Sequence, residues 1–103
     1  NRKIVYKYTE VIKLLDSSLF EIINKSNIRS FYFPIANCRE ILYKIFETEK
    51  FDPILLSMGK FLEQLKKYEE IDKLGEDESN KMSLTILKWK KDITDKILKI
   101  QKE

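Results

Sequence analysis

Apolar side chains recur every three or four residues over four stretches of the chain, which is the spacing of one face of an α-helix. These stretches cover residues 4–24, 34–46, 52–67 and about 80–101. We therefore expect an all-α domain, a compact bundle of four to five helices whose apolar faces meet in one core. Five residues on these faces are expected to lie in that core: Leu42, Phe61, Leu65, Ile86 and Trp89.

Proline and glycine mark the expected helix boundaries. Pro34 is expected to open the second helix, because the first helical turn does not use the N–H that proline lacks; residues 25–33 would then form a connection. Asp52 and Pro53 have the residue types of an N-cap and a first helical position. Gly59 interrupts the third stretch, and it either splits that stretch into two short helices or marks a close packing point.

Composition agrees with one helical domain over residues 1–103. The chain contains only 2 Gly and 2 Pro, fewer turn residues than strand-rich folds need. The helical spacing of apolar residues in the last stretch continues to about 101. No apolar run approaches the roughly 20 residues that cross a bilayer, so no membrane contact is expected. Because the chain begins with Asn1, we expect it to be a piece of a larger protein.

The residues needed for common catalytic and metal sites are missing or badly spaced. The chain has no histidine, which removes Ser-His and Cys-His pairs. Cys38, the single cysteine, occupies an apolar position and is expected to be an inert core residue. The acidic clusters at 69–72 and 76–78 lack the spacing of a calcium loop. We expect no enzyme activity, no metal and no cofactor.

Lysines are dense in the second half of the chain, although the net charge is only +3. Many follow an acid by four residues, as Lys67 follows Glu63 and Lys99 follows Asp95. That order favours a solvated helix surface over a phosphate-binding face. Nucleic-acid binding, which would be weak, is kept as an alternative. Another alternative is self-association through the last helix, where apolar residues over 97–100 either pack back on the first helix or pair with a second copy.

Three consecutive aromatic residues, Phe31, Tyr32 and Phe33, fall in the expected connection over 25–33. Three large rings are more than a simple turn requires. They are expected to plug the core, since one buried aromatic side chain stabilises a small domain considerably. The alternative is that one of the rings lines an exposed hydrophobic pocket for a partner.

Three segments occur in an order that resembles a known family. They read CREILYKI over 38–45, FDPILLSMGKFLEQLKK over 51–67 and LTILKWKK over 84–91. Over about 5–93 the chain is similar to the TFIIS N-terminal domain family, also called the LW domain, which includes elongin A and the integrase-binding domain of LEDGF. The resemblance implies a right-handed bundle of four or five helices in a nuclear protein of transcription elongation.

The resemblance also implies a binding site. Domains of this family dock disordered segments with acidic and aromatic residues, here from transcription elongation proteins, where two inter-helix loops meet. By position these loops are 26–33 and 71–77. The expected partner-binding residues are Ile28, Arg29, Phe31, Ile71, Lys73 and Leu74. The apolar ones would take the partner's ring, whereas Arg29 and Lys73 would attract its acids. LEDGF-type domains have an acid where Arg29 stands, which implies a different partner preference.

Overall fold

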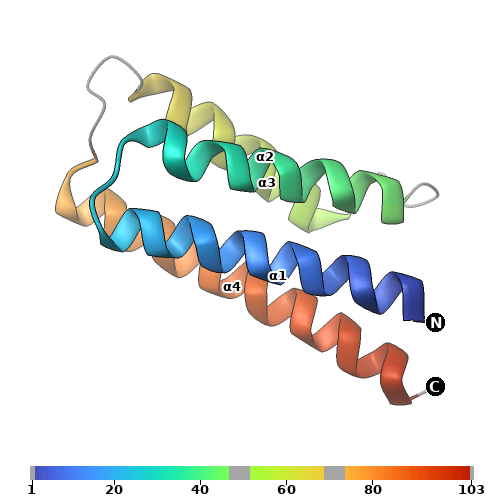
Figure 1. The fold of residues 1–103 in the computed structure, drawn as a ribbon. Coiled ribbons are helices and arrows are strands. Elements are labelled where there is room, and N and C mark those ends of the chain that lie inside the picture. The colour runs from blue at the N-terminus through green and yellow to red at the C-terminus, as the bar shows by residue number, and fades with distance from the viewer. Residues whose placement is uncertain (1, 47–51, 69–73, 103) are drawn as a thin grey trace.

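The structure, a computed structural model, describes residues 2–46, 52–68 and 74–102 and consists there of four α-helices. Their bounds are Arg2–Ile23 for α1, Ile28–Ile45 for α2, Pro53–Lys67 for α3 and Glu76–Lys102 for α4. Each helix runs antiparallel to the one before it (Figure 1). The expected all-α bundle is therefore confirmed, with four helices. No helix within these residues is long and apolar enough to span a membrane.

The apolar stripes of the four helices meet in a single core. All five residues expected there, Leu42, Phe61, Leu65, Ile86 and Trp89, are buried. The Trp89 indole also links two helices, because its N–H donates a 2.9 Å hydrogen bond to Ser57 Oγ on α3. Its ring lies edge-on to Phe61, with 5.0 Å between the ring centroids. One side chain of α4 thus supplies both apolar contact and a satisfied polar group to α3.

Helix α2 begins six residues before Pro34, so the prediction that Pro34 opens it, and that 25–33 is a connection, is wrong. Asn27 is the N-cap, and its Oδ1 accepts hydrogen bonds from the backbone N–H of Ser30 at 3.1 Å and from its Oγ at 2.9 Å. This cap starts the helix. Apolar side chains on the core-facing side of α2, Ile28 and Phe31 among them, then outweigh the hydrogen bond that the proline ring removes.

The aromatic run consequently lies on a helix rather than in a loop. Phe31 is buried at 2% exposure, as core plugging predicts, while Phe33 is 59% exposed. The Ser18 hydroxyl, itself buried on α1, donates a 3.0 Å hydrogen bond to the Phe31 carbonyl oxygen. Phe31 therefore ties the first turns of α2 to α1 through both its side chain and its backbone.

Gly59 lies inside an unbroken α3, so a split into two short helices is wrong and close packing is the correct alternative. A Cβ added there would come within 3.3 Å of Arg39 Nη2. The Arg39 side chain crosses from α2, where its Nε donates to the Leu55 carbonyl at 3.4 Å and its Nη2 donates to the Tyr43 hydroxyl at 3.1 Å. Gly59 leaves room for this guanidinium between the two helices.

Helix α3 has the N-cap that the sequence predicts: Asp52 Oδ1 accepts a 2.9 Å hydrogen bond from the Ile54 N–H, and Pro53 opens the helix. The other oxygen of this carboxylate, Oδ2, lies 3.4 Å from Lys96 Nζ on α4. Lys96 is four residues after Asp92, yet it pairs with Asp52 instead. The second ion pair among the described residues also joins two helices, with 2.8 Å between Lys90 Nζ and Asp16 Oδ1.

Helix α4 begins at Glu76, with three acids in its first turn, and continues to Lys102. Acids at this position interact favourably with the helix dipole. Near its end, Ile97 and Ile100 are partly buried and pack on the core, whereas Leu98 is half exposed. The apolar tail therefore packs back on the bundle, which was one of the two expected outcomes for it.

Candidate protein-binding site at the loop end

The two ends of the bundle are different in kind. One end, here called the loop end, contains the α1–α2 turn at 24–27, the last turn of α3 and the beginning of α4 (Figure 1). The opposite end, here called the terminal end, contains the beginning of α1 and the end of α4. The loop over 26–33 and the described part of the second expected loop, residues 74–77, belong to the loop end.

The turn after α1 closes in a specific backbone geometry. Lys25 has a positive φ of 55°, the conformation in which glycine is usually found after a helix. The Lys25 N–H donates to the Ile22 carbonyl at 3.1 Å, and the Ser26 N–H donates to the Glu21 carbonyl at 3.0 Å. This pair of bonds is a Schellman motif, and it turns the chain sharply into the Asn27 cap of α2.

A small hollow, here called the inner cavity, lies between this turn and the start of α4. Its volume is about 90 Å³. Its walls combine residues of both expected loops with neighbouring helix residues: Ile22, Lys25, Ser26, Phe31, Leu74 and Ser79. An apolar cavity of about 150 Å³ is known to hold benzene, so the inner cavity is too small for an aromatic ring.

A larger hollow, here called the outer pocket, lies on the other side of the first turns of α2. It has a volume of about 240 Å³, enough for an aromatic side chain. The lining residues come from the start of α2 and the end of α3: Ile28, Arg29, Tyr32, Phe33, Leu65 and Lys66. The rings of Tyr32 and Phe33 lie edge-on, with centroids 5.7 Å apart. The exposed ring of Phe33 is thus held beside an open apolar space.

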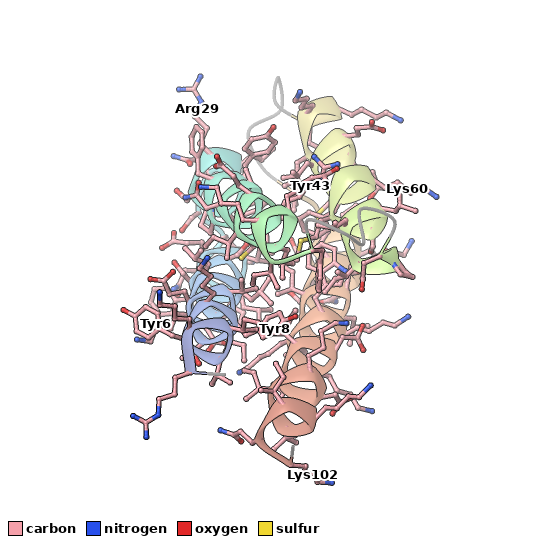
Figure 2. All side chains as sticks on the ribbon, turned by 90° about the vertical axis from the view of Figure 1, so that its right-hand side faces the viewer. Tyr6, Tyr8, Arg29, Tyr43, Lys60 and Lys102 are labelled. Carbon is pink, nitrogen blue, oxygen red and sulfur yellow. The ribbon has the colours of Figure 1, made fainter. Side chains whose placement is uncertain are left out.

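The charges at the outer pocket have one sign. Arg29 and Lys66 are both exposed, and neither forms an ion pair with a residue that the structure describes. The Arg29 side chain extends away from the bundle (Figure 2). Among the described lining residues there is no carboxylate. The pocket therefore combines an apolar interior with a cationic rim, which favours a ligand that carries a ring next to acidic groups.

The expected partner-binding residues divide between the two hollows. Arg29 and Ile28 line the outer pocket, with Ile28 buried as part of its floor. Phe31 and Leu74 line the inner cavity. Ile71 and Lys73 fall outside the described residues. The structure thus brings four of the six to one end of the bundle but separates them by one turn of α2.

Three residues of the outer pocket, Tyr32, Phe33 and Lys66, are not among the expected partner-binding residues. For Tyr32 and Phe33 the sequence offers a pocket-lining ring only as an alternative, and it places the aromatic run in a loop. On a helix, two residues correspond to about 200° of rotation, so burial of Phe31 forces Phe33 toward solvent. The available signal was Asn27, whose residue type is favoured at N-caps and would have placed the helix start before the aromatic run.

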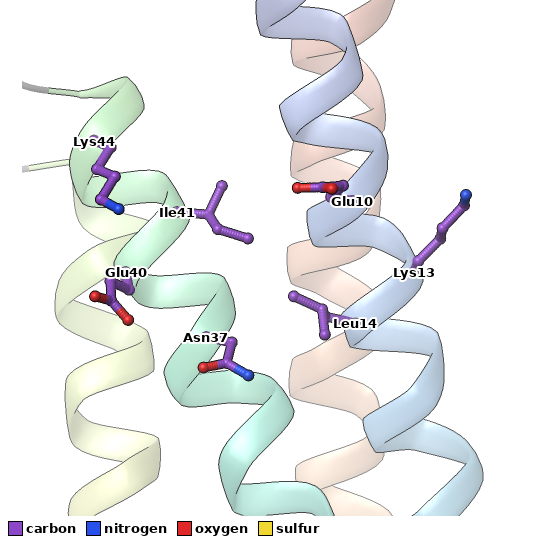
Figure 3. A pocket seen from close by; sticks show the side chains of 7 residues that line it. All are labelled: Glu10, Lys13, Leu14, Asn37, Glu40, Ile41 and Lys44. Atoms are coloured by element: carbon purple, nitrogen blue, oxygen red, sulfur yellow. The ribbon is translucent and has the colours of Figure 1, made fainter.

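Two larger grooves carry both signs of charge. The groove between α1 and α2 has a volume of about 470 Å³, and Leu14 and Ile41 point toward each other across it (Figure 3). Glu10, Lys13, Glu40 and Lys44 surround them. The α3–α4 groove, of about 700 Å³, likewise mixes lysines with glutamates. Neither groove selects a ligand by charge, unlike the outer pocket.

Cys38 is chemically quiet. Its side chain is fully buried, and its Sγ lies 3.5 Å from the Val11 carbonyl oxygen as a donor. Burial raises the pKa of the thiol from 9.0 to about 12, because the thiolate would be desolvated. Within the residues that the structure describes, no group of three or more acids or cysteines is placed to hold a metal ion.

Comparisons with known proteins add no relative. No family model, no curated protein and no solved structure matches the chain.

Proposed function

We propose that this domain is a protein-interaction module that docks a short disordered segment at its loop end. The guest's aromatic ring enters the outer pocket, and its acidic residues lie beside Arg29 and Lys66. The observation that carries this proposal is the pocket itself: a space of about 240 Å³ with an exposed phenyl ring on its wall and two cations at its rim.

The exposed ring of Phe33 supports an aromatic guest. Folding leaves this ring 59% exposed while Phe31, two residues earlier, is buried. A guest ring that packs edge-on against Phe33 would add about 0.5–1.5 kcal/mol beyond the apolar area it buries. Nearby cations add little net affinity at an exposed rim, but they speed association and exclude basic segments.

The biological setting of the proposal comes from the resemblance to the TFIIS N-terminal domain family. On that basis the domain is part of a nuclear protein of transcription elongation, and its guests are disordered segments of other proteins in that process. The four-helix bundle is compatible with this assignment. The chemistry of the outer pocket supports docking of an acidic and aromatic segment independently of that resemblance.

A peptide titration tests the docking. The probe is a 12-residue peptide with one phenylalanine flanked by aspartates and glutamates, and the matched control peptide has alanine in place of the phenylalanine. We expect the probe to bind and to shift the amide resonances of residues 28–33 and 65–66, with affinity falling as salt is added. The control peptide should bind at least tenfold more weakly.

Variants locate the site. Phe33→Ala should weaken the probe about tenfold or more, as loss of a central aromatic contact does. Tyr6→Ala, which removes an exposed ring at the terminal end, is the matched control and should bind normally. Equal binding of the probe by Phe33→Ala and the unmodified domain would rule out the outer pocket.

A titration also distinguishes nucleic-acid binding from peptide docking. Several lysines of α4 have no ion-pair partner among the described residues, so a duplex DNA titration at two salt concentrations is informative. Tight binding with a steep loss between low and physiological salt would favour that alternative over peptide docking.

A further inference from the structure

A second exposed apolar surface lies along the side of the bundle, on α1 and α4. It consists of Phe20 and Ile23 on α1 and Leu84 and Leu87 on α4, and is here called the side patch. Each of these side chains is between 48% and 71% exposed. None of them lines the outer pocket or the inner cavity. The proposed loop-end function therefore does not account for their exposure.

The register of the two helices brings the four side chains to one level. Helices α1 and α4 are antiparallel (Figure 1), and the 2.8 Å pair between Asp16 and Lys90 fixes which residues face each other. Phe20 and Ile23 lie one and two turns from Asp16 toward the loop end. Leu87 and Leu84 lie one and two turns from Lys90 in the same direction. The apolar pair on α1 therefore lies beside the apolar pair on α4.

The helical rotation of α4 places its two leucines away from α3. Trp89 faces α3, as its hydrogen bond to Ser57 shows, while Lys90 faces α1. Leu87, three residues before Lys90, lies on the same side of α4, and Leu84 lies next to it toward solvent. Both leucines are thus available to a molecule that approaches the α1–α4 side of the bundle.

The charges beside the side patch are basic. Lys88 and Lys91 follow Leu84 and Leu87 by four residues, which makes them direct neighbours on the helix surface. Both lysines are exposed, and neither forms an ion pair with a described residue. Asp16, which precedes Phe20 by one turn on α1, is already paired with Lys90. The patch therefore presents apolar contact together with unpaired positive charge.

We propose that the side patch is a second docking surface, which binds an amphipathic helix of a partner protein with acidic residues beside its apolar face. Four large side chains at this exposure offer on the order of 400 Å² of apolar surface, within the range of the largest patches on monomeric proteins. A helix laid against α1 and α4 covers such an area with two or three turns.

A second copy of this chain fits the side patch less well. A stable dimer buries about 800 Å² on each partner, roughly twice what the patch offers. A symmetric pairing would also place Lys88 and Lys91 of one copy close to the same lysines of the other. Glutamates on a partner helix are attracted by those lysines instead, which is why the occupant is an acidic helix.

A designed peptide tests this proposal on the intact chain. The probe is an 18-residue helical peptide with leucines along one face and glutamates elsewhere, and the control peptide has the same composition in scrambled order. We expect the probe to shift the amide resonances of residues 16–23 and 83–91. Its affinity should fall severalfold between low and physiological salt, and the scrambled peptide should bind at least tenfold more weakly.

A matched pair of variants identifies the surface. Leu84→Gln combined with Leu87→Gln should weaken the probe at least tenfold while leaving thermal unfolding unchanged, because both side chains are exposed. Leu56→Gln removes a comparably exposed leucine from α3 and should bind the probe normally. Phe33→Ala should also bind it normally, which separates this proposal from docking at the loop end.

Several results would overturn the side patch as a helix-docking surface. One is the absence of resonance shifts at millimolar peptide, and another is shifts confined to residues 28–33 and 65–66. A concentration-dependent dimer in sedimentation that the double variant abolishes would assign the patch to a second copy. Stronger binding of the unmodified chain to anionic phospholipid vesicles than to the peptide, lost in the double variant, would assign it to a lipid surface.

Discussion

Near the terminal end of the bundle a buried ring and a lysine contact residues of other helices, whereas at the loop end an exposed ring and two described cations border a pocket. At the terminal end the rings of Tyr8 and Phe46 lie 6.3 Å apart. Lys96 Nζ lies 5.1 Å from the centroid of the Phe46 ring and also pairs with Asp52. At the loop end, Phe33 and Arg29 line a pocket; the Phe33 ring lies edge-on to its neighbour Tyr32, and Arg29 has no ion-pair partner among the described residues.

This difference separates residues that hold the fold from residues that are available to a partner. A cation over a ring and beside a carboxylate has its interactions satisfied within the chain. Arg29 and Lys66 have no such partners among the described residues. The contrast predicts that substitution of the paired terminal-end residues changes stability and that substitution of the residues lining the outer pocket changes binding.

The largest effect is expected between the two ends, where Trp89 links α3 and α4. Trp89→Ala should lower the free energy of unfolding by about 3–5 kcal/mol, because it leaves a large cavity and removes the donor to Ser57. Both ends should lose structure together. Urea unfolding followed by circular dichroism measures this, with Leu56→Ala as a surface control. A loss below 1 kcal/mol would mean that α4 is held mainly by α1.

Phenylalanine truncations compare the two ends directly. Phe46→Ala at the terminal end should cost about 3 kcal/mol of stability, since the ring is buried between Tyr8 and Lys96. Phe33→Ala at the loop end should cost less than about 0.5 kcal/mol, as most exposed substitutions do. Urea midpoints of the two variants measure the difference. Similar losses at both positions would contradict the proposed division of roles.

The two N-caps give a smaller version of the same test. Asn27 caps α2 at the loop end and Asp52 caps α3 at the terminal end, but only Asp52 also pairs with a lysine. Asn27→Ala should cost about 1 kcal/mol. Asp52→Ala should cost about 1.5–2 kcal/mol, because the pairing with Lys96 is lost as well. The difference should shrink in 1 M salt, and a difference unchanged by salt would argue against the ion pair.

The smallest expected effect is a gain in stability. Lys25→Gly should raise the free energy of unfolding by about 0.5–1 kcal/mol, because glycine adopts a positive φ without the steric cost that lysine bears. Thermal unfolding measures this, and Ser26→Gly is the neighbouring control, with no gain expected. Destabilisation by Lys25→Gly would show that the lysine side chain contributes contacts that outweigh its backbone strain.

The sequence predicts the elements of this fold better than their boundaries. Helical periodicity identifies the four helices and the five core residues, and the Asp52 and Pro53 pair identifies the start of α3. The start of α2 is missed because proline is favoured in the first turn, whereas here tertiary burial of Phe31 keeps a proline inside the helix. The sequence leaves two alternatives for Gly59. The contact that explains this glycine comes from the Arg39 side chain on another helix, which no local pattern predicts.

Partner binding at the loop end stays a prediction, although several of the expected residues do lie there. The resemblance assigns Arg29 and Leu74 to one end of the bundle, where the structure puts both. It does not reveal that they belong to separate hollows. Phe33 and Lys66 come from different helices, and their approach depends on how α2 packs on α3. That packing is a property of the assembled core, which no local pattern encodes.

Pro34 has a mechanical consequence for the loop end. An ordinary residue at this position would donate its N–H to the Ser30 carbonyl, so the start of α2 is attached to the rest of the helix by one bond fewer. The same segment forms the partition between the inner cavity and the outer pocket, and Ser18 anchors it through the Phe31 carbonyl. The hydrogen bond from Ser18 therefore supplies, from α1, an attachment in place of the one that Pro34 removes from α2.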